Sequence, residues 1–231
     1  MTKATLLDIE GTTTPIDFVH ETLFPFAKAR IGRFVSEHFD RLHPEIIEVA
    51  DEHAHDGKYT LPLDPTEPGS VSAYLEFLID HDRKSTPLKS IQGKIWQEGY
   101  ELGELVSEVF DDVPAAFERW KSEGKTVAIF SSGSILAQKL IFKYSDHGDL
   151  TQFIDNYFDT NIGHKREAGS YRNIASQLNI NAGEILFISD IAQELDAARS
   201  AGMQTALSVR PGNAEINSGP NHRIISSFEE V

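Results

Sequence analysis

The fold is decided by residues 4–14, which read Ala4-Thr-Leu-Leu-Asp8-Ile-Glu10-Gly-Thr-Thr-Thr14. The first part is a short, largely apolar run that is typical of a buried strand, and the polar residues after it are typical of a turn. In a parallel sheet, ligands bind beyond the carboxyl ends of the strands. The stretch therefore predicts that Asp8 and Glu10 lie at the chemically active edge of a sheet.

Later runs repeat this form. Apolar strands are expected at residues 126–130, 184–188 and 205–209, and they end in Ser131-Ser-Gly-Ser134, Ser189-Asp190 and Arg210-Pro-Gly-Asn213. Helical patterns lie around them, at residues 113–123, 135–144, 170–178 and 194–201. Because strands alternate with helices, we expect an α/β fold with a Rossmann-like parallel sheet core.

The interval between the first two strands is too long for a simple crossover. Its apolar residues recur at near-helical spacing: Phe24, Phe26, Ile31, Phe34, Val35 and Phe39, then Val71, Tyr74, Leu75 and Leu78. An irregular connection is expected at residues 57–69, which contain three prolines. The sequence thus predicts a catalytic core of residues 1–14 and 113–231 with an inserted helical cap of residues 15–112. Residues 217–231 are expected to form a surface loop and a short closing element.

The composition restricts the partners and the compartment. The 231 residues carry a formal net charge of −15 and contain no cysteine. Nucleic acid and anionic membranes need a basic surface, so neither is an expected partner. The absence of cysteine excludes disulfides and thiolate chemistry and fits a reducing compartment, and no apolar run reaches the roughly 20 residues of a membrane span. We therefore expect a cytoplasmic protein, and a monomer.

Asp8 and Glu10 suggest phosphoester chemistry. Phosphate esters are so inert that an enzyme needs a nucleophile, charge neutralisation and protonation of the leaving group together. Asp8 is the candidate nucleophile and Glu10 the candidate acid and base. A strand-end acid can also merely cap the next turn, which is the alternative for this motif taken alone.

Three further groups complete the set. Ser131 and Ser132 precede a helix, where hydroxyls and free backbone N–H groups favour an anion, although a serine there can be an ordinary N-cap. Lys165 could neutralise a phosphate, although a lone lysine is more often a solvated surface residue. Asp190 is placed to bind Mg²⁺, which prefers oxygen ligands, or to cap the following helix.

The order of these signals resembles the haloacid-dehalogenase-like superfamily. The resemblance extends over nearly the whole chain to the enolase-phosphatase (acireductone synthase) family of methionine salvage. It is carried by the stretches Asp8 to Ile16, Gln92-Gly-Lys-Ile-Trp96, Ser131 to Ser134, Phe158-Asp-Thr160, Ile162-Gly-His-Lys165 and Val209-Arg-Pro-Gly-Asn213.

The resemblance implies a bifunctional reaction with one Mg²⁺ per chain. The substrate, 2,3-diketo-5-methylthiopentyl-1-phosphate, would be enolised and then dephosphorylated, through an aspartyl-phosphate on Asp8, to the acireductone 1,2-dihydroxy-3-keto-5-methylthiopentene. The family's metal positions fall on Asp8, Glu10 and Asp190, with the backbone carbonyl of Glu10 as the more plausible ligand. Its substrate-binding positions fall on Ser131, Ser132 and Lys165, and Lys165 would also serve as a catalytic residue.

The roles of further acids and two alternative functions remain open. Ile191 follows Asp190 where the superfamily often has a second acid, and Glu194 and Asp196 are the nearest further acids. Either could steady a metal-bound water, although the helix dipole alone explains an acid at Glu194, and neither is counted as a metal ligand. A sugar or glycolate phosphatase of the same superfamily is the alternative enzyme. A receiver-like signalling module is the alternative of another class, and the long insert disfavours it.

Two features of the insert have a plain and a functional interpretation. His53 and His55 stand in an acidic patch that could hold a transition metal, although a solvated face explains it as well. Trp96 and Tyr100 lie four residues apart on an expected helix and could contact the thioether end of the substrate, although such residues are more often core.

Overall fold

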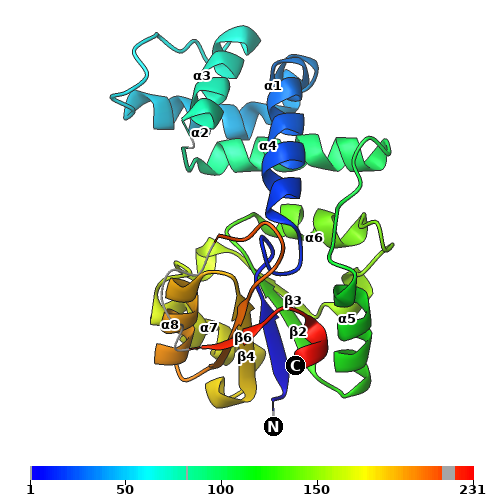
Figure 1. Cartoon of the computed structure of the whole chain (residues 1–231). Coiled ribbons are helices and arrows are strands. Elements are labelled where there is room, and N and C mark those ends of the chain that lie inside the picture. The colour runs from blue at the N-terminus through cyan, green and yellow to red at the C-terminus, as the bar shows by residue number, and fades with distance from the viewer. Residues whose placement is uncertain (1, 82, 215–221) are drawn as a thin grey trace. The chain divides into compact units, whose positions relative to one another are not determined.

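The computed structural model describes residues 2–81, 83–214 and 222–231. The chain divides into two compact units, Met1–Val19 with Val106–Val231, and His20–Leu105 (Figure 1). The first unit contains the sheet and the second is helical. No helix among the described residues is long and apolar enough to cross a membrane.

The first unit confirms the predicted α/β fold. Its sheet has the order β3-β2-β1-β4-β5-β6, and every neighbouring pair is parallel. The strands are β1 (Ala4–Leu7), β2 (Thr126–Phe130), β3 (Asn156–Phe158), β4 (Ile185–Ser189), β5 (Gln204–Ser208) and β6 (Arg223–Ile225). This is the Rossmann strand order, in which β1 lies at the centre.

Helices cover both faces of the sheet, which is why β1 is buried along its whole length. The helices are α5 (Asp112–Ser122), α6 (Ile135–Lys143), α7 (Ala168–Leu178) and α8 (Ala192–Ser200). On the face of α7 and α8, Leu6 and Phe187 of the sheet share one core cluster with Tyr171 and Leu195. α5 packs on the sheet beside β2 and is drawn on the opposite side from α7 and α8 in Figure 1.

The strands that the sequence did not predict are the shortest ones. β3 and β6 have three residues each, too few to form a recognisable apolar run. The predicted short closing element is present at the end of the chain, where Ile225 and Phe228 are fully buried and Phe228 packs against Trp120 of α5. Of the predicted closing stretch, residues 217–221 lie outside the described residues.

The second unit contains α1 (Phe24–His38), α2 (His43–Ala54), α3 (Pro68–Asp80) and α4 (Thr86–Glu101). Each of these helices has a proline in its first turn, where the missing N–H costs nothing. The predicted irregular connection lies between α2 and α3.

The aromatic residues and histidines of this unit are engaged within it. Trp96 and Tyr100 are buried, and Trp96 Nε1 donates to the carbonyl of Leu23 at 2.8 Å, so both belong to the core of the helical unit. His53 Nε2 lies 3.0 Å from the Leu61 carbonyl, and His55 Nδ1 lies 2.8 Å from the Asp51 carbonyl. These contacts support the plain interpretation of the four residues.

Gly99 gives a test of the packing of the helical unit. A Cβ atom on Gly99 of α4 would lie 2.4 Å from the ring of Phe26 in α1, whereas a Cβ on Gly69 of α3 would meet nothing within 4 Å. We expect Gly99→Ala to lower the melting temperature, because overpacking costs about 1–3 kcal/mol. Gly69→Ala, the matched control, should leave it equal or higher, because alanine favours a helix. A Gly99→Ala protein that melts at or above the wild-type temperature would contradict this packing.

Candidate active site

The central strands of the sheet deliver the predicted site residues to one edge. Asp8 follows β1, Ser131 follows β2 and Asp190 follows β4, and β2 and β4 flank β1. Lys165 comes from the segment between β3 and α7. The carboxyl ends of parallel strands meet at the same edge, so the topology brings residues together that are up to 182 positions apart in sequence (190 − 8).

A buried lysine joins two carboxylates at this edge. Lys165 Nζ lies 2.7 Å from Asp8 Oδ1 and 2.7 Å from Glu194 Oε2. The side chains of Asp8 and Lys165 are each 7% exposed, and that of Glu194 is 10% exposed. Charges this deeply buried are stable only when they are paired. Lys165 therefore holds the Asp8 side chain as an oriented carboxylate.

Two further donors fix the Asp8 carboxylate. The Ile9 N–H donates to Asp8 Oδ1 at 2.8 Å, and the Ser189 hydroxyl lies 3.1 Å from Asp8 Oδ2. Ser189 Oγ also lies 3.1 Å from Glu194 Oε2 and accepts from the Ile191 N–H. Because a hydroxyl carries one proton, Ser189 donates to one carboxylate at a time.

The pKa values of the site follow from its burial and its excess of negative charge. Burial by itself lowers the pKa of Lys165, but Asp8 and Glu194 outweigh it and raise that pKa above its ordinary value. Burial, reinforced by the Asp8 charge, raises the pKa of Asp190 to about 7. The same two causes raise the pKa of Glu194 to about 7, against the effect of Lys165. The Lys165 ammonium group thus contacts two of the three carboxyl groups, those of Asp8 and Glu194.

The turn after Asp8 is tightly hydrogen bonded. The N–H groups of Thr12, Thr13 and Thr14 all lie 2.9–3.1 Å from the Ile9 carbonyl, and the Gly11 N–H donates to the Thr14 carbonyl at 2.8 Å. Gly11 has a φ of +66°, which only glycine adopts at low cost. Glu10, half-buried, is held within this turn beside the nucleophile candidate.

The turn after β2 divides its serines between two tasks. Ser134 caps α6 by accepting from the Ala137 N–H at 3.3 Å, so the N-cap interpretation applies to Ser134. Ser131 is buried, and its N–H donates to the Phe158 carbonyl. Ser132 is exposed on the turn just before the helix. Ser131 and Ser132 therefore stand at a helix N-terminus beyond the carboxyl end of β2, where an anion is favoured.

The donor set suits Mg²⁺. Asp8 and Asp190 contribute hard carboxylate oxygens, and two carboxylates plus waters are the usual protein contribution to a Mg²⁺ site. Among the described residues, no group of three or more His, Cys, Asp or Glu side chains could hold a metal ion, so Mg²⁺ here would also need a backbone carbonyl and waters as ligands. Burial, and after it the nearby Asp8 carboxylate, raise the pKa of Asp190, and a divalent cation bound between the two side chains would favour the ionised form of Asp190.

Glu194 is the site residue that the sequence left unassigned. It is the third residue of α8, so its side chain returns towards the end of β4, where it reaches Lys165. The signal that could have located it is the spacing of four from Asp190, one helical turn from a strand end. Asp196, the other candidate, is more than half exposed and pairs with Arg199 and His222 instead.

Comparisons with known proteins agree with this geometry. The family of haloacid dehalogenase-like hydrolases matches residues 2–202. A protein of Synechococcus elongatus named enolase-phosphatase E1 is 49% identical over 98% of this chain and 96% of its own length. A protein of Drosophila pseudoobscura pseudoobscura with the same name is 44% identical over 99% and 94%. The crystal structure of the UTR4 protein of Saccharomyces cerevisiae is 34% identical, with a TM-score of 0.83 and full coverage of both chains.

The fold and the matched family define a haloacid dehalogenase-like hydrolase. Within that class, the chain belongs to the enolase-phosphatase family. The resemblance read from the sequence is confirmed at the level of the family and of the enzyme class, a phosphatase.

The raised pKa of Asp190 predicts how pH affects stability without Mg²⁺. An acid whose pKa is raised in the folded state binds its proton more tightly when folded, so its contribution to stability is lost as pH rises from about 4 to about 7. Asp190→Asn removes this loss. In Mg²⁺-free buffer at pH 8 we expect the variant to melt several degrees above the wild type, and the difference should shrink towards pH 4.

The matched control is Asp40→Asn, which changes an exposed aspartate of the helical unit. It should show no such pH-dependent difference in melting temperature. An Asp190→Asn protein that is less stable than wild type at pH 8, or equally shifted at every pH, would contradict the charge balance described for this site.

Proposed function

We propose that the cluster around Asp8 carries out the enolase-phosphatase reaction of the family on a phosphorylated diketone, 2,3-diketo-5-methylthiopentyl-1-phosphate. The observation that carries the proposal is the buried contact between Lys165 and Asp8 at 2.7 Å, at the carboxyl end of the central strand. It orients a buried carboxyl oxygen that is shielded from water, which is what a nucleophile on phosphorus requires.

The substrate phosphate would bind among Ser131, Ser132 and Lys165. This assignment is supported by the position of the serines at the N-terminus of α6 and by the positive charge of Lys165. A single Mg²⁺ would be held by the carboxylates of Asp8 and Asp190 and the carbonyl of Glu10. When bound, it would supply charge neutralisation for the phosphate and polarisation of the diketone oxygens.

The first half-reaction is assigned to Glu10. Its carboxylate takes a proton from the carbon that bears the phosphate ester and returns it to the neighbouring carbonyl oxygen, which gives the enol. The position of Glu10 in the hydrogen-bonded turn, two residues after Asp8, supports this role. A base placed in this way typically contributes about 10²–10⁴-fold to the rate.

The second half-reaction uses Asp8 as the nucleophile. Glu10 first takes up a proton from water. An Asp8 oxygen then forms a bond to phosphorus while the bond from phosphorus to the enol oxygen breaks, and Glu10 gives that oxygen its proton. Water then attacks the aspartyl-phosphate, Glu10 takes a proton from the water, and phosphate leaves with the Asp8 carboxylate restored.

The proposal also includes the role of the insert, the compartment of the protein and its oligomeric state. Residues 15–112 are inserted directly after the turn that carries Glu10, and we assign them the role of a cap that selects the substrate. We also propose a cytoplasmic monomer, which the lack of cysteine and the net charge of −15 favour.

Substitution of the nucleophile tests the proposed reaction. With the diketone phosphate, the wild-type protein should release phosphate and form the acireductone, followed by its absorbance, only when Mg²⁺ is present. Asp8→Asn should abolish phosphate release. Hydrolysis of simple sugar phosphates with no activity on the diketone would instead assign the chain a different substrate.

Substitution of Glu10 tests its assignment in both half-reactions. Glu10→Gln keeps the size of the side chain and the backbone carbonyl but removes the base, so enolisation and phosphate release should each fall by about 10²-fold or more. Glu101→Gln, an exposed change at the end of α4, is the matched control. If both half-reactions of Glu10→Gln stay within a few-fold of the wild-type rates, another residue is the base.

A further inference from the structure

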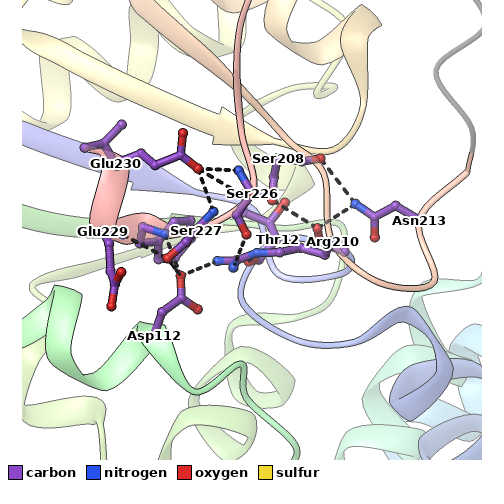
Figure 2. A network of polar contacts seen from close by, with 12 residues as sticks. Thr12, Asp112, Ser208, Arg210, Asn213, Ser226, Ser227, Glu229 and Glu230 are labelled. Atoms are coloured by element: carbon purple, nitrogen blue, oxygen red, sulfur yellow. Dashed lines mark hydrogen bonds and ion pairs between the residues drawn. The ribbon is translucent and has the colours of Figure 1, made fainter.

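The stretch Arg210-Pro-Gly-Asn213 follows β5 and has no part in the proposed chemistry. Figure 2 shows that it is the centre of a network of polar contacts that reaches both the turn after Asp8 and the C-terminal residues. β4 lies between β5 and β1, so this segment reaches the turn after Asp8 from a strand that is not adjacent to β1.

Arg210 anchors the segment. Its side chain is buried, with Nη2 at 2.9 Å from Asp112 Oδ2 and Nη1 donating to the Ser226 carbonyl at 2.8 Å. The guanidinium lies 4.7 Å from the ring centroids of Phe110 and Phe228. Five N–H donors in a rigid fork allow one arginine to hold several partners at fixed angles.

Side-chain donors of this anchored segment form hydrogen bonds to the backbone of the turn after Asp8. Asn213 Nδ2 donates to the Gly11 carbonyl at 2.9 Å and to the Ser208 carbonyl at 3.2 Å. Arg210 Nε donates to the Thr12 carbonyl at 3.3 Å. The Ser208 hydroxyl also donates to the Gly11 carbonyl, at 3.3 Å. The backbone immediately after Glu10 is thus held from outside the turn as well as from within it.

The orientation of the Asn213 amide is determined by its neighbours. Its Nδ2 faces two carbonyl oxygens, so the reversed orientation would place acceptor against acceptor. Its Oδ1 is buried, has no hydrogen-bond partner among the described residues, and lies against Gly11. A Cβ on Gly11 would come within 2.8 Å of this oxygen and 2.6 Å of Asp190 Oδ2. Gly11 is therefore enclosed between Asn213 and a predicted metal ligand.

We propose that Asn213 is a positioning residue of the active site, which holds the Gly11 carbonyl and thereby fixes the peptide chain that carries Glu10 beside Asp8. The inference rests on the proposed roles of Asp8 and Glu10. The Gly11 carbonyl lies one residue after Glu10, so a rotation about the Gly11 backbone would move the chain that carries the Glu10 side chain and the Glu10 carbonyl. Misplacement of a catalytic group by about 1 Å can cost about 10²-fold in rate.

The role predicts a particular kinetic signature. Ser131, Ser132 and Lys165, the proposed phosphate contacts, lie on other segments, so substrate binding should survive when the turn is loosened. Residues that orient a metal ligand from behind typically contribute about 10–100-fold to metal affinity or activity. Loss of the Asn213 donor should therefore lower kcat and the affinity for Mg²⁺ with little change in KM.

The experiment uses the full chain with Asn213→Ala and, as the matched control, Gln204→Ala. Gln204 lies at the other end of β5, where its amide donates to the Gly183 carbonyl at 2.8 Å. kcat and KM would be measured with the diketone phosphate, binding of Mg²⁺ alone by calorimetry, and folding by thermal melting. Asn213→Asp, which keeps the shape but replaces the donor, provides a second variant if Asn213→Ala melts near the assay temperature.

We expect kcat to fall about 10–100-fold and Mg²⁺ affinity to fall about tenfold in Asn213→Ala, with KM within about threefold of wild type, while Gln204→Ala remains unchanged. A kcat within about threefold of wild type in both Asn213 variants would overturn the inference, as would an equal loss in Gln204→Ala. If the wild type itself fails on the diketone, the proposed function fails instead, and the positioning role is then measured on hydrolysis of an aryl phosphate.

Discussion

The candidate active site depends on one buried ammonium group shared between two carboxylates. Lys165 Nζ contacts Asp8 and Glu194 at 2.7 Å each, in surroundings where an unpaired charge is very costly. The interaction fixes the orientation of the Asp8 side chain, and Lys165 is the cation in direct contact with both of these buried carboxyl groups. Burial together with the nearby Asp8 carboxylate raises the pKa of Asp190, and the carboxyl groups of Asp8 and Asp190 make the site suitable for Mg²⁺.

The remainder of the sheet unit supplies the constraints that this interaction needs. Parallel strands in the order β3-β2-β1-β4-β5-β6 bring Asp8, Ser131 and Asp190 to one edge, while helices on both faces exclude water from the strands. The turn after Asp8 is closed by its own hydrogen bonds to Ile9 and is held from outside by Asn213. The scaffold thus limits movement where the chemistry would be most sensitive to it.

The sequence predicted the features that are local or strongly patterned. Residues 126–130 form β2 as expected because five consecutive apolar or β-branched residues have few alternatives. β3 and β6 were missed because three residues carry no pattern, and Phe228 was missed because nothing in a short tail indicates that it packs on Trp120. These short elements form because they pair or pack with segments that are distant in the sequence, and a local sequence pattern does not record such contacts.

The residues of the candidate site likewise divide into those that a local sequence pattern predicts and those that it does not. Asp8, Ser131 and Asp190 could be located because each ends an apolar run. Glu194 could not be assigned, because its contact with Lys165 joins residues from different loops and any helix start favours an acid. Asn213 stood in a recognised motif, but only the folded structure brings its amide to the Gly11 carbonyl.

The central claim is that Asp8 forms a bond to phosphorus, and the most direct measurement is to look for that bond. Wild-type protein turning over a substrate that carries radioactive phosphorus would be quenched in acid, digested and separated into peptides. The account predicts acid-stable label, lost in mild base, on the peptide that contains Asp8, and none in Asp8→Asn. Phosphate release without any labelled Asp8 peptide, or with the label on another residue, would contradict it.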